Sequence, residues 1–212
     1  MTTTTLTSHV TPKKQPSVKE VLFEILALVL FLITPPAIAY FDILVLGVPL
    51  REQSTTEVTQ HLCLATCCIL FALGARQYPE KRGYLSMIAF TFLVLLIREH
   101  NFYFNLIIHG LWQVPAIIAI IVGIVFVRRH RATIRQPLLD HFQTRGFAYA
   151  IVGLILLIFF SRLYGSGGLQ RAVHGEAYNS DAKMFIQEGT ELLGYAILLF
   201  GSIVSYRQRF SN

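Results

Sequence analysis

Ionisable residues with helical spacing are the features of this sequence that could carry chemistry. Glu57 and His61 are four residues apart, and Glu188 and Glu191 are three residues apart. On a helix, residues three or four apart share one face, so each pair would present its side chains in one direction. Carboxylates and imidazoles bind divalent cations, and they also act as general acids and bases. The two pairs are therefore candidate parts of a binding or catalytic site.

Further ionisable residues lie at the ends of other apolar segments. Arg98, Glu99 and His100 follow one another directly, His109 comes shortly afterwards, and Arg162 closes a later segment. The planar guanidinium group of arginine matches the oxygen geometry of carboxylates and phosphates. We therefore assign Arg98 and Arg162 to ion pairing or anion binding.

Long apolar segments must position these side chains. The chain is 54% hydrophobic and only 14% charged, whereas soluble domains carry roughly 25% charged residues. Crossing a bilayer core takes a helix of about 20 mostly apolar residues. Six such segments predict an all-α polytopic transmembrane bundle in residues 21–206, with a tail at 1–20 and another at 207–212. The approximate spans are 21–42, 57–75, 84–100, 106–127, 147–163 and 184–206.

The basic residues fall mostly on one side of these six spans. Thirteen of the 18 lysines and arginines lie in the segments that would share a side with both termini. Short loops rich in Lys and Arg remain in the cytoplasm. The distribution predicts cytoplasmic N- and C-termini in a multi-pass protein of the cell membrane or an inner membrane. It also accounts for the net charge of +6, so the expected partners are membrane lipids and other membrane proteins, not nucleic acid.

The same topology brings the candidate residues to the outer end of the bundle. Eight of the 12 acidic residues and four of the seven histidines fall in the outer half. Charged groups in or near hydrocarbon are costly, so they are usually paired or functional. The sequence therefore predicts an outer polar pocket formed by Glu57, His61, Arg98, Glu99, His100, His109, Arg162, Glu188 and Glu191.

A divalent metal is the first ligand that this pocket could hold. A bound metal could activate water, which would make the protein a membrane-embedded hydrolase. The sequence contains no His-Glu-x-x-His motif, so this hypothesis depends on spacing alone. The candidate metal ligands are Glu57, His61, His109, Glu188 and Glu191. The candidate catalytic residues are Glu99, His109, Glu188 and Glu191.

Two other interpretations of the pocket stay open. A lipid headgroup could bind there, with Arg98 and Arg162 pairing with its anionic group. Alternatively, the charged residues could form a structural ion-pair network that sets helix packing. The protein would then be a non-enzymatic small transporter or a subunit of a membrane complex.

Overall fold

The chain folds into an all-helical bundle. The computed structural model describes residues 17–50 and 54–209, and all regular secondary structure in these ranges is helical. The expected all-α class is thereby confirmed. Most of the N-terminal tail (1–16) and the end of the C-terminal tail (210–212) lie outside the described residues.

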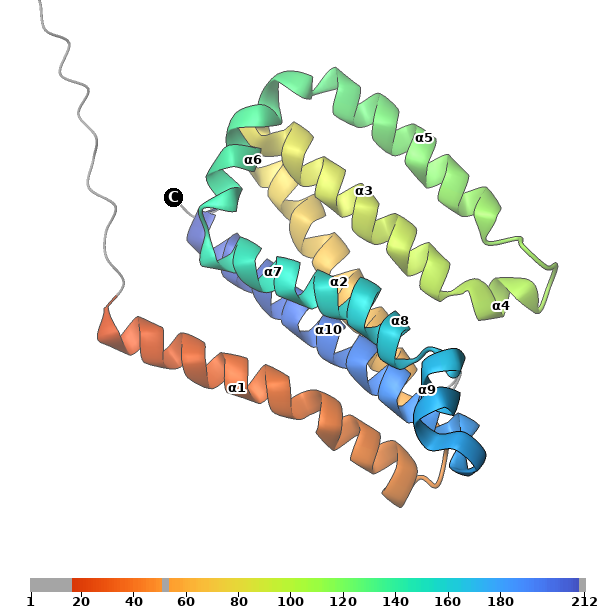
Figure 1. Cartoon of the computed structure of the whole chain (residues 1–212). Coiled ribbons are helices and arrows are strands. Elements are labelled where there is room, and N and C mark those ends of the chain that lie inside the picture. Colours follow the sequence, from red (N-terminus) through yellow and green to blue (C-terminus); the bar gives the residue numbers. More distant parts are fainter. Residues whose placement is uncertain (1–16, 51–53, 210–212) are drawn as a thin grey trace, which may run out of the picture.

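In the described residues, six helices of 11 or more residues make up the bundle, and they run alongside one another (Figure 1). They are α1 (Val18–Tyr40), α2 (Thr55–Gln77), α3 (Arg82–Glu99), α5 (Gln113–Arg129), α7 (Arg145–Ile155) and α10 (Ser180–Arg209). Two π-helical turns extend α1 and α7, namely η1 (Phe41–Val45) and η4 (Leu156–Phe160). The short elements are η2 (Pro79–Lys81), α4 (Asn101–Asn105), η3 (Arg131–Thr133), α6 (Arg135–Phe142), α8 (Ser161–Tyr164), α9 (Gly167–His174) and η5 (Gly175–Ala177).

Among the described residues, four helical segments are long and apolar enough, by length and composition, to cross a membrane. They are Val18–Val45, Thr55–Gln77, Arg145–Tyr164 and Ser180–Gln208. The other two expected spans correspond to α3, which has 18 residues including three charged ones, and to α5, which has 17. At 1.5 Å per residue, α5 is about 26 Å long, slightly less than the ~30 Å of a bilayer core.

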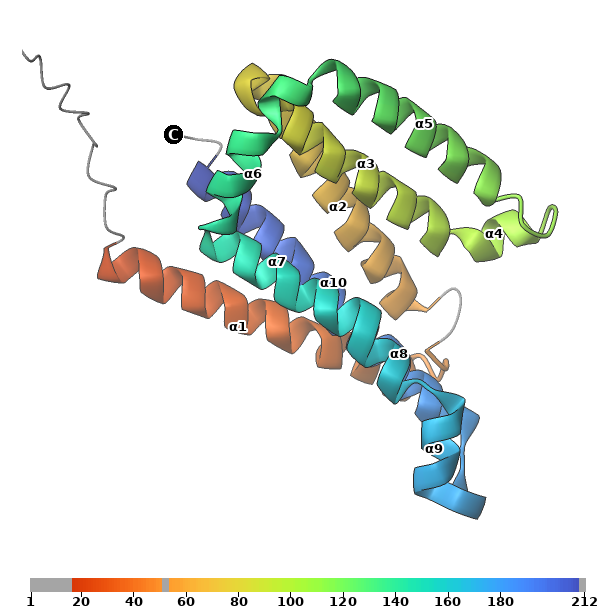
Figure 2. The same ribbon diagram turned by 45° about the horizontal axis from the view of Figure 1, so that its top comes forward.

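Helix α10 lies at the centre of the bundle, and α1 and α5 lie at opposite edges (Figures 1 and 2). α10 packs against α7, α2 and α1, whereas α5 packs against α3. Glycines let α7 and α10 approach closely. A Cβ atom added to Gly153 would lie 2.6 Å from the backbone nitrogen of Leu198, and one added to Gly201 would lie 2.5 Å from that of Ala150. The backbones of α7 and α10 therefore lie in close contact at these glycines.

A buried carboxylate joins the end of the first long segment to the start of the second. Asp42, fully buried in η1, accepts hydrogen bonds from the backbone nitrogens of Thr55 and Thr56 at 3.0 and 2.8 Å. It also accepts one from the Thr56 hydroxyl at 2.7 Å. The first N–H groups of a helix have no partner within the helix, so these bonds fix where α2 begins and hold α1 beside it.

The hairpin between α3 and α5 differs from the expected one. The span predicted at 106–127 begins as turns, and helix α5 starts only at Gln113. Gly110 has a φ of +82°, and its N–H donates to the Asn105 side chain at 2.8 Å. A glycine adopts this left-handed conformation without strain, and an asparagine side chain stabilises turns. As a result, His109 is exposed in the turn instead of lying one turn inside a helix.

Candidate functional site

A group of ionisable side chains gathers at the end of the bundle where α2 and α10 begin and α3 ends (Figure 1). Helices α2, α3, α8 and α10 contribute to it, together with His100 directly after α3. Hydrogen bonds, ion pairs, a ring stack and electrostatic interactions connect its members. We call this group the carboxylate cluster; it consists of Glu57, Gln60, His61, Arg98, Glu99, His100, Arg162, Glu188, Glu191 and Tyr195.

Helix α10 supplies two carboxylates to the cluster, each held by a different neighbour. Glu188 accepts a hydrogen bond at 3.2 Å from the side-chain amide of Gln60, which α2 contributes. Glu191 accepts one from Gln187 at 3.2 Å and lies 3.7 Å from the guanidinium of Arg162 on α8. The Glu191 side chain is 7% exposed and that of Arg162 is 54% exposed. The carboxylate therefore lies inside the cluster and the guanidinium group lies at its edge.

The end of α3 repeats this arrangement. Glu99 pairs with Arg98 at 2.8 Å and also accepts a hydrogen bond at 2.9 Å from the hydroxyl of Tyr195 on α10. The Tyr195 residue is only 2% exposed. The Arg98 side chain is 44% exposed against 17% for Glu99, so this carboxylate too is the more buried partner.

Two histidines join α2 to α3 at the margin of the cluster. The His61 ring stacks on that of His100, with their centroids 4.1 Å apart. Glu57 lies 3.9 Å from His61 and shares its helix face, as their spacing predicted. The expected convergence of α2 and α3 at one end of the bundle is therefore present in the structure.

The cluster carries more negative than positive charge. Glu188 interacts electrostatically with Glu99, Glu191 and Arg162, and Glu191 interacts with Arg98 as well. Four glutamates face two arginines, so the net charge is −2 when all four carboxyl groups are ionised and the histidines are neutral. Because water screens the buried carboxylates poorly, they favour an additional cationic group close by.

The five predicted metal ligands do not converge. Within residues 17–50 and 54–209, no three His, Cys, Asp or Glu side chains are placed so that they could hold one metal ion. His109 is separated from the others by its position in the exposed turn before α5.

Eight of the nine residues predicted for the pocket belong to the cluster, and His109 does not. Tyr195 and Gln60 belong to the cluster although neither was predicted for the pocket, and Gln60 carries no charge that would distinguish it within an apolar helix. Its position between Glu57 and His61 was the available signal. Gln60 is 2% exposed, and it is the direct contact between α2 and Glu188.

Comparisons of the chain with protein-family models, with curated proteins and with solved structures give no match. The function must therefore be inferred from the chemistry of the cluster itself. That chemistry consists of largely buried carboxylates in excess, with two arginines exposed at the edge.

Proposed function

We propose that the chain is a six-span protein of the cell membrane or an inner membrane, with both termini in the cytoplasm and the carboxylate cluster at the outer surface. Four segments have the length and hydropathy of membrane spans, and α3 and α5 run alongside them (Figure 2). The distribution of Lys and Arg supports the orientation.

Cysteine labelling tests this topology. In a background without Cys63, Cys67 and Cys68, a single cysteine replaces either Arg131 in η3 or the exposed Glu176 in η5. A membrane-impermeant maleimide is expected to label position 176 in intact cells and position 131 only after the membrane is opened. Labelling of position 131 in intact cells would refute the proposed orientation.

We propose that the carboxylate cluster binds the zwitterionic headgroup of an amine-bearing phospholipid such as phosphatidylethanolamine. The observation that carries this proposal is the excess of buried carboxylates with arginines at the edge. A primary ammonium group has three N–H donors, which suits carboxylates such as Glu188 and Glu191. The lipid phosphate would pair with Arg98 and Arg162, whose guanidinium groups match its geometry.

The other ligands considered for the pocket fit its charge less well. An anionic headgroup without an amine would meet the unbalanced carboxylates and be repelled. A metal-dependent hydrolase needs several ligands around one ion, and no such group occurs in the described parts of the chain. The hydrolase hypothesis thus stays a prediction from spacing, and the headgroup is the better-supported ligand.

Native mass spectrometry of the full chain can test the headgroup preference. Phosphatidylethanolamine, phosphatidylcholine and phosphatidylglycerol with identical acyl chains would compete for the protein released from detergent. We expect the ethanolamine lipid to bind about tenfold more tightly than the glycerol lipid, a difference of about 1.4 kcal/mol. Phosphatidylcholine should also bind less tightly, because its quaternary ammonium has no N–H donor. Equal retention of all three lipids would contradict the proposal.

A structural network is the second candidate role for the cluster. The Arg162–Glu191 pair connects α8 with α10, and the Tyr195–Glu99 hydrogen bond connects α10 with α3. Contacts of this kind hold helices together without any ligand. In this case the protein would be a small transporter or a complex subunit whose function lies elsewhere.

A further inference from the structure

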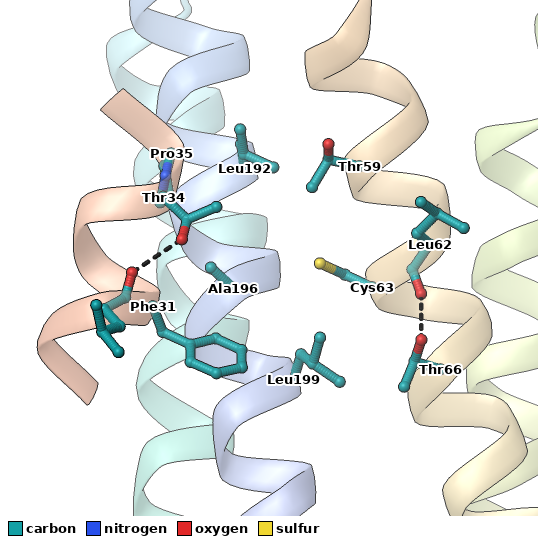
Figure 3. A pocket seen from close by; sticks show the side chains of 11 residues that line it. Phe31, Thr34, Pro35, Thr59, Leu62, Cys63, Thr66, Leu192, Ala196 and Leu199 are labelled. Atoms are coloured by element: carbon teal, nitrogen blue, oxygen red, sulfur yellow. Dashed lines mark hydrogen bonds between the residues drawn. The ribbon is translucent and has the colours of Figure 1, made fainter. Parts of the chain in front are cut away.

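An apolar cavity of about 340 Å³ lies between α1, α2 and α10. Figure 3 shows side chains from all three helices pointing into it, with α10 between α1 and α2. Its inner wall is formed by Cys63, Leu192 and Ala196, all of which are buried, together with the half-buried Leu199. The volume falls within the range of small-molecule sites, about 300–1,000 Å³.

The hydroxyl groups in the cavity wall are already hydrogen-bonded. Thr34, Thr59 and Thr66 each donate to the backbone carbonyl four residues earlier, at distances of 2.7–2.8 Å. Figure 3 shows two of these bonds, those of Thr34 and Thr66. A polar occupant would lose its hydrogen bonds to water, and the cavity wall offers few groups that could replace them. This loss is costly. The wall therefore suits a hydrocarbon chain.

The cavity begins one helical turn along α10 from Glu188 of the carboxylate cluster. Glu188, Leu192 and Ala196 follow one another at intervals of four residues, so they lie along one face of α10. Leu192 and Leu199 are about 6 and 17 Å along the helix from Glu188, at 1.5 Å per residue. On α2, Gln60 contacts Glu188 and is next in sequence to Thr59 of the cavity wall. An amphipathic molecule could thus reach both sites at once.

The cavity opens sideways between α1 and α2. Leu30 on α1 is 59% exposed and Leu62 on α2 is 61% exposed, although both line the cavity. In the six-span arrangement proposed above, this opening faces the hydrocarbon of the bilayer. The molecules available at such an opening are the acyl chains of membrane lipids.

We propose that this cavity holds one acyl chain of the phospholipid whose headgroup occupies the carboxylate cluster. The inference rests on the proposed headgroup function and extends it to the whole lipid. Burial of each methylene group contributes to binding through the hydrophobic effect, so the chain adds affinity and the headgroup adds selectivity. The protein then recognises an intact phospholipid and not a soluble amine.

Photocrosslinking in vesicles tests where the chain lies. The probes are phosphatidylethanolamine and phosphatidylglycerol that carry the same diazirine in the upper half of one acyl chain. We expect crosslinks on peptides that contain residues 30–35, 59–66 and 192–199. Thr66→Phe and Thr34→Phe place a ring at the exposed rim of the cavity on two different helices, and each should lower this labelling about tenfold.

A matched control and the choice of two lipids separate the possible outcomes. Ile69→Phe adds a ring at a 56% exposed site of α2 outside the cavity, and it should leave labelling unchanged. Equal labelling by both lipids, lowered by the rim substitutions, would support the cavity inference while the headgroup proposal fails. A preference for the ethanolamine lipid without any effect of either rim substitution would overturn the cavity inference and leave the headgroup proposal standing.

Discussion

Replacing Gly201 with alanine should destabilise the bundle by about 2 kcal/mol, because overpacking a tight contact typically costs 1–3 kcal/mol. The added Cβ would lie 2.5 Å from the backbone nitrogen of Ala150 and 2.7 Å from the carbonyl oxygen of Gly146. Neither backbone atom can rotate away, so α7 would have to separate from α10. The substitution Gly153→Ala should act in the same direction, since its Cβ would meet Leu198.

A second glycine of α10 provides a control, because its replacement should change the stability in the opposite direction. Gly189 also lies in α10, but a Cβ added there would meet nothing within 4 Å. Gly189→Ala should therefore raise stability by up to about 1 kcal/mol, which is the difference in helix propensity between the two residues. Unfolding by denaturing detergent, followed by circular dichroism, measures both variants. Equal effects of Gly201→Ala and Gly189→Ala would show that α7 and α10 do not pack as described.

Loss of headgroup selectivity is the expected result of replacing both Glu188 and Glu191 with glutamine. The two substitutions preserve side-chain size and remove two of the four carboxyl groups, so that two glutamates remain opposite two arginines. Hydrogen bonds to charged groups contribute about 1.5–3 kcal/mol each. The affinity for phosphatidylethanolamine should therefore fall about tenfold to a hundredfold. Competition between lipids in native mass spectra measures this change.

Thermal stability of the same double variant distinguishes the binding site from the structural network. Binding sites often contain charges that repel one another, and this cost in stability is tolerated for function. Because the double variant removes two of these charges, it should be as stable as the native protein or more stable. Glu24→Gln serves as a control, because Glu24 pairs with Arg145 at 3.2 Å near the opposite end of the bundle. It should not alter lipid selectivity. A large loss of stability in the double variant with unchanged selectivity would favour the structural network.

The sequence predicted the parts of the structure that depend on composition and short-range spacing. The apolar segments became helices, and the i, i+4 spacing of Glu57 and His61 gave the shared face that it implied. The convergence of Glu99, Glu188 and Glu191 followed from placing segment ends on the same side of a bundle. Hydrophobic length and helical periodicity suffice for these features.

Features that depend on particular side-chain contacts, whether within a turn or between distant segments, could not be predicted. The turn at Gly110 uses an Asn105 side chain and removed His109 from the expected helix, although the apolar residues 106–108 resemble the start of a span. The Gln60–Glu188 hydrogen bond joins residues 128 positions apart in the sequence. The cavity likewise exists only because α1, α2 and α10 meet, and apolar patterning alone does not specify where three helices leave space.

The lipid that accompanies the protein from its membrane is the most direct test of the headgroup proposal. The protein would be purified in mild detergent, and its retained phospholipids would be compared with those of the membrane extract. We expect close to one retained lipid per chain, enriched in primary-amine headgroups relative to the extract. Retained lipids that match the composition of the membrane, or that are enriched in anionic headgroups, would contradict a zwitterionic site in the carboxylate cluster.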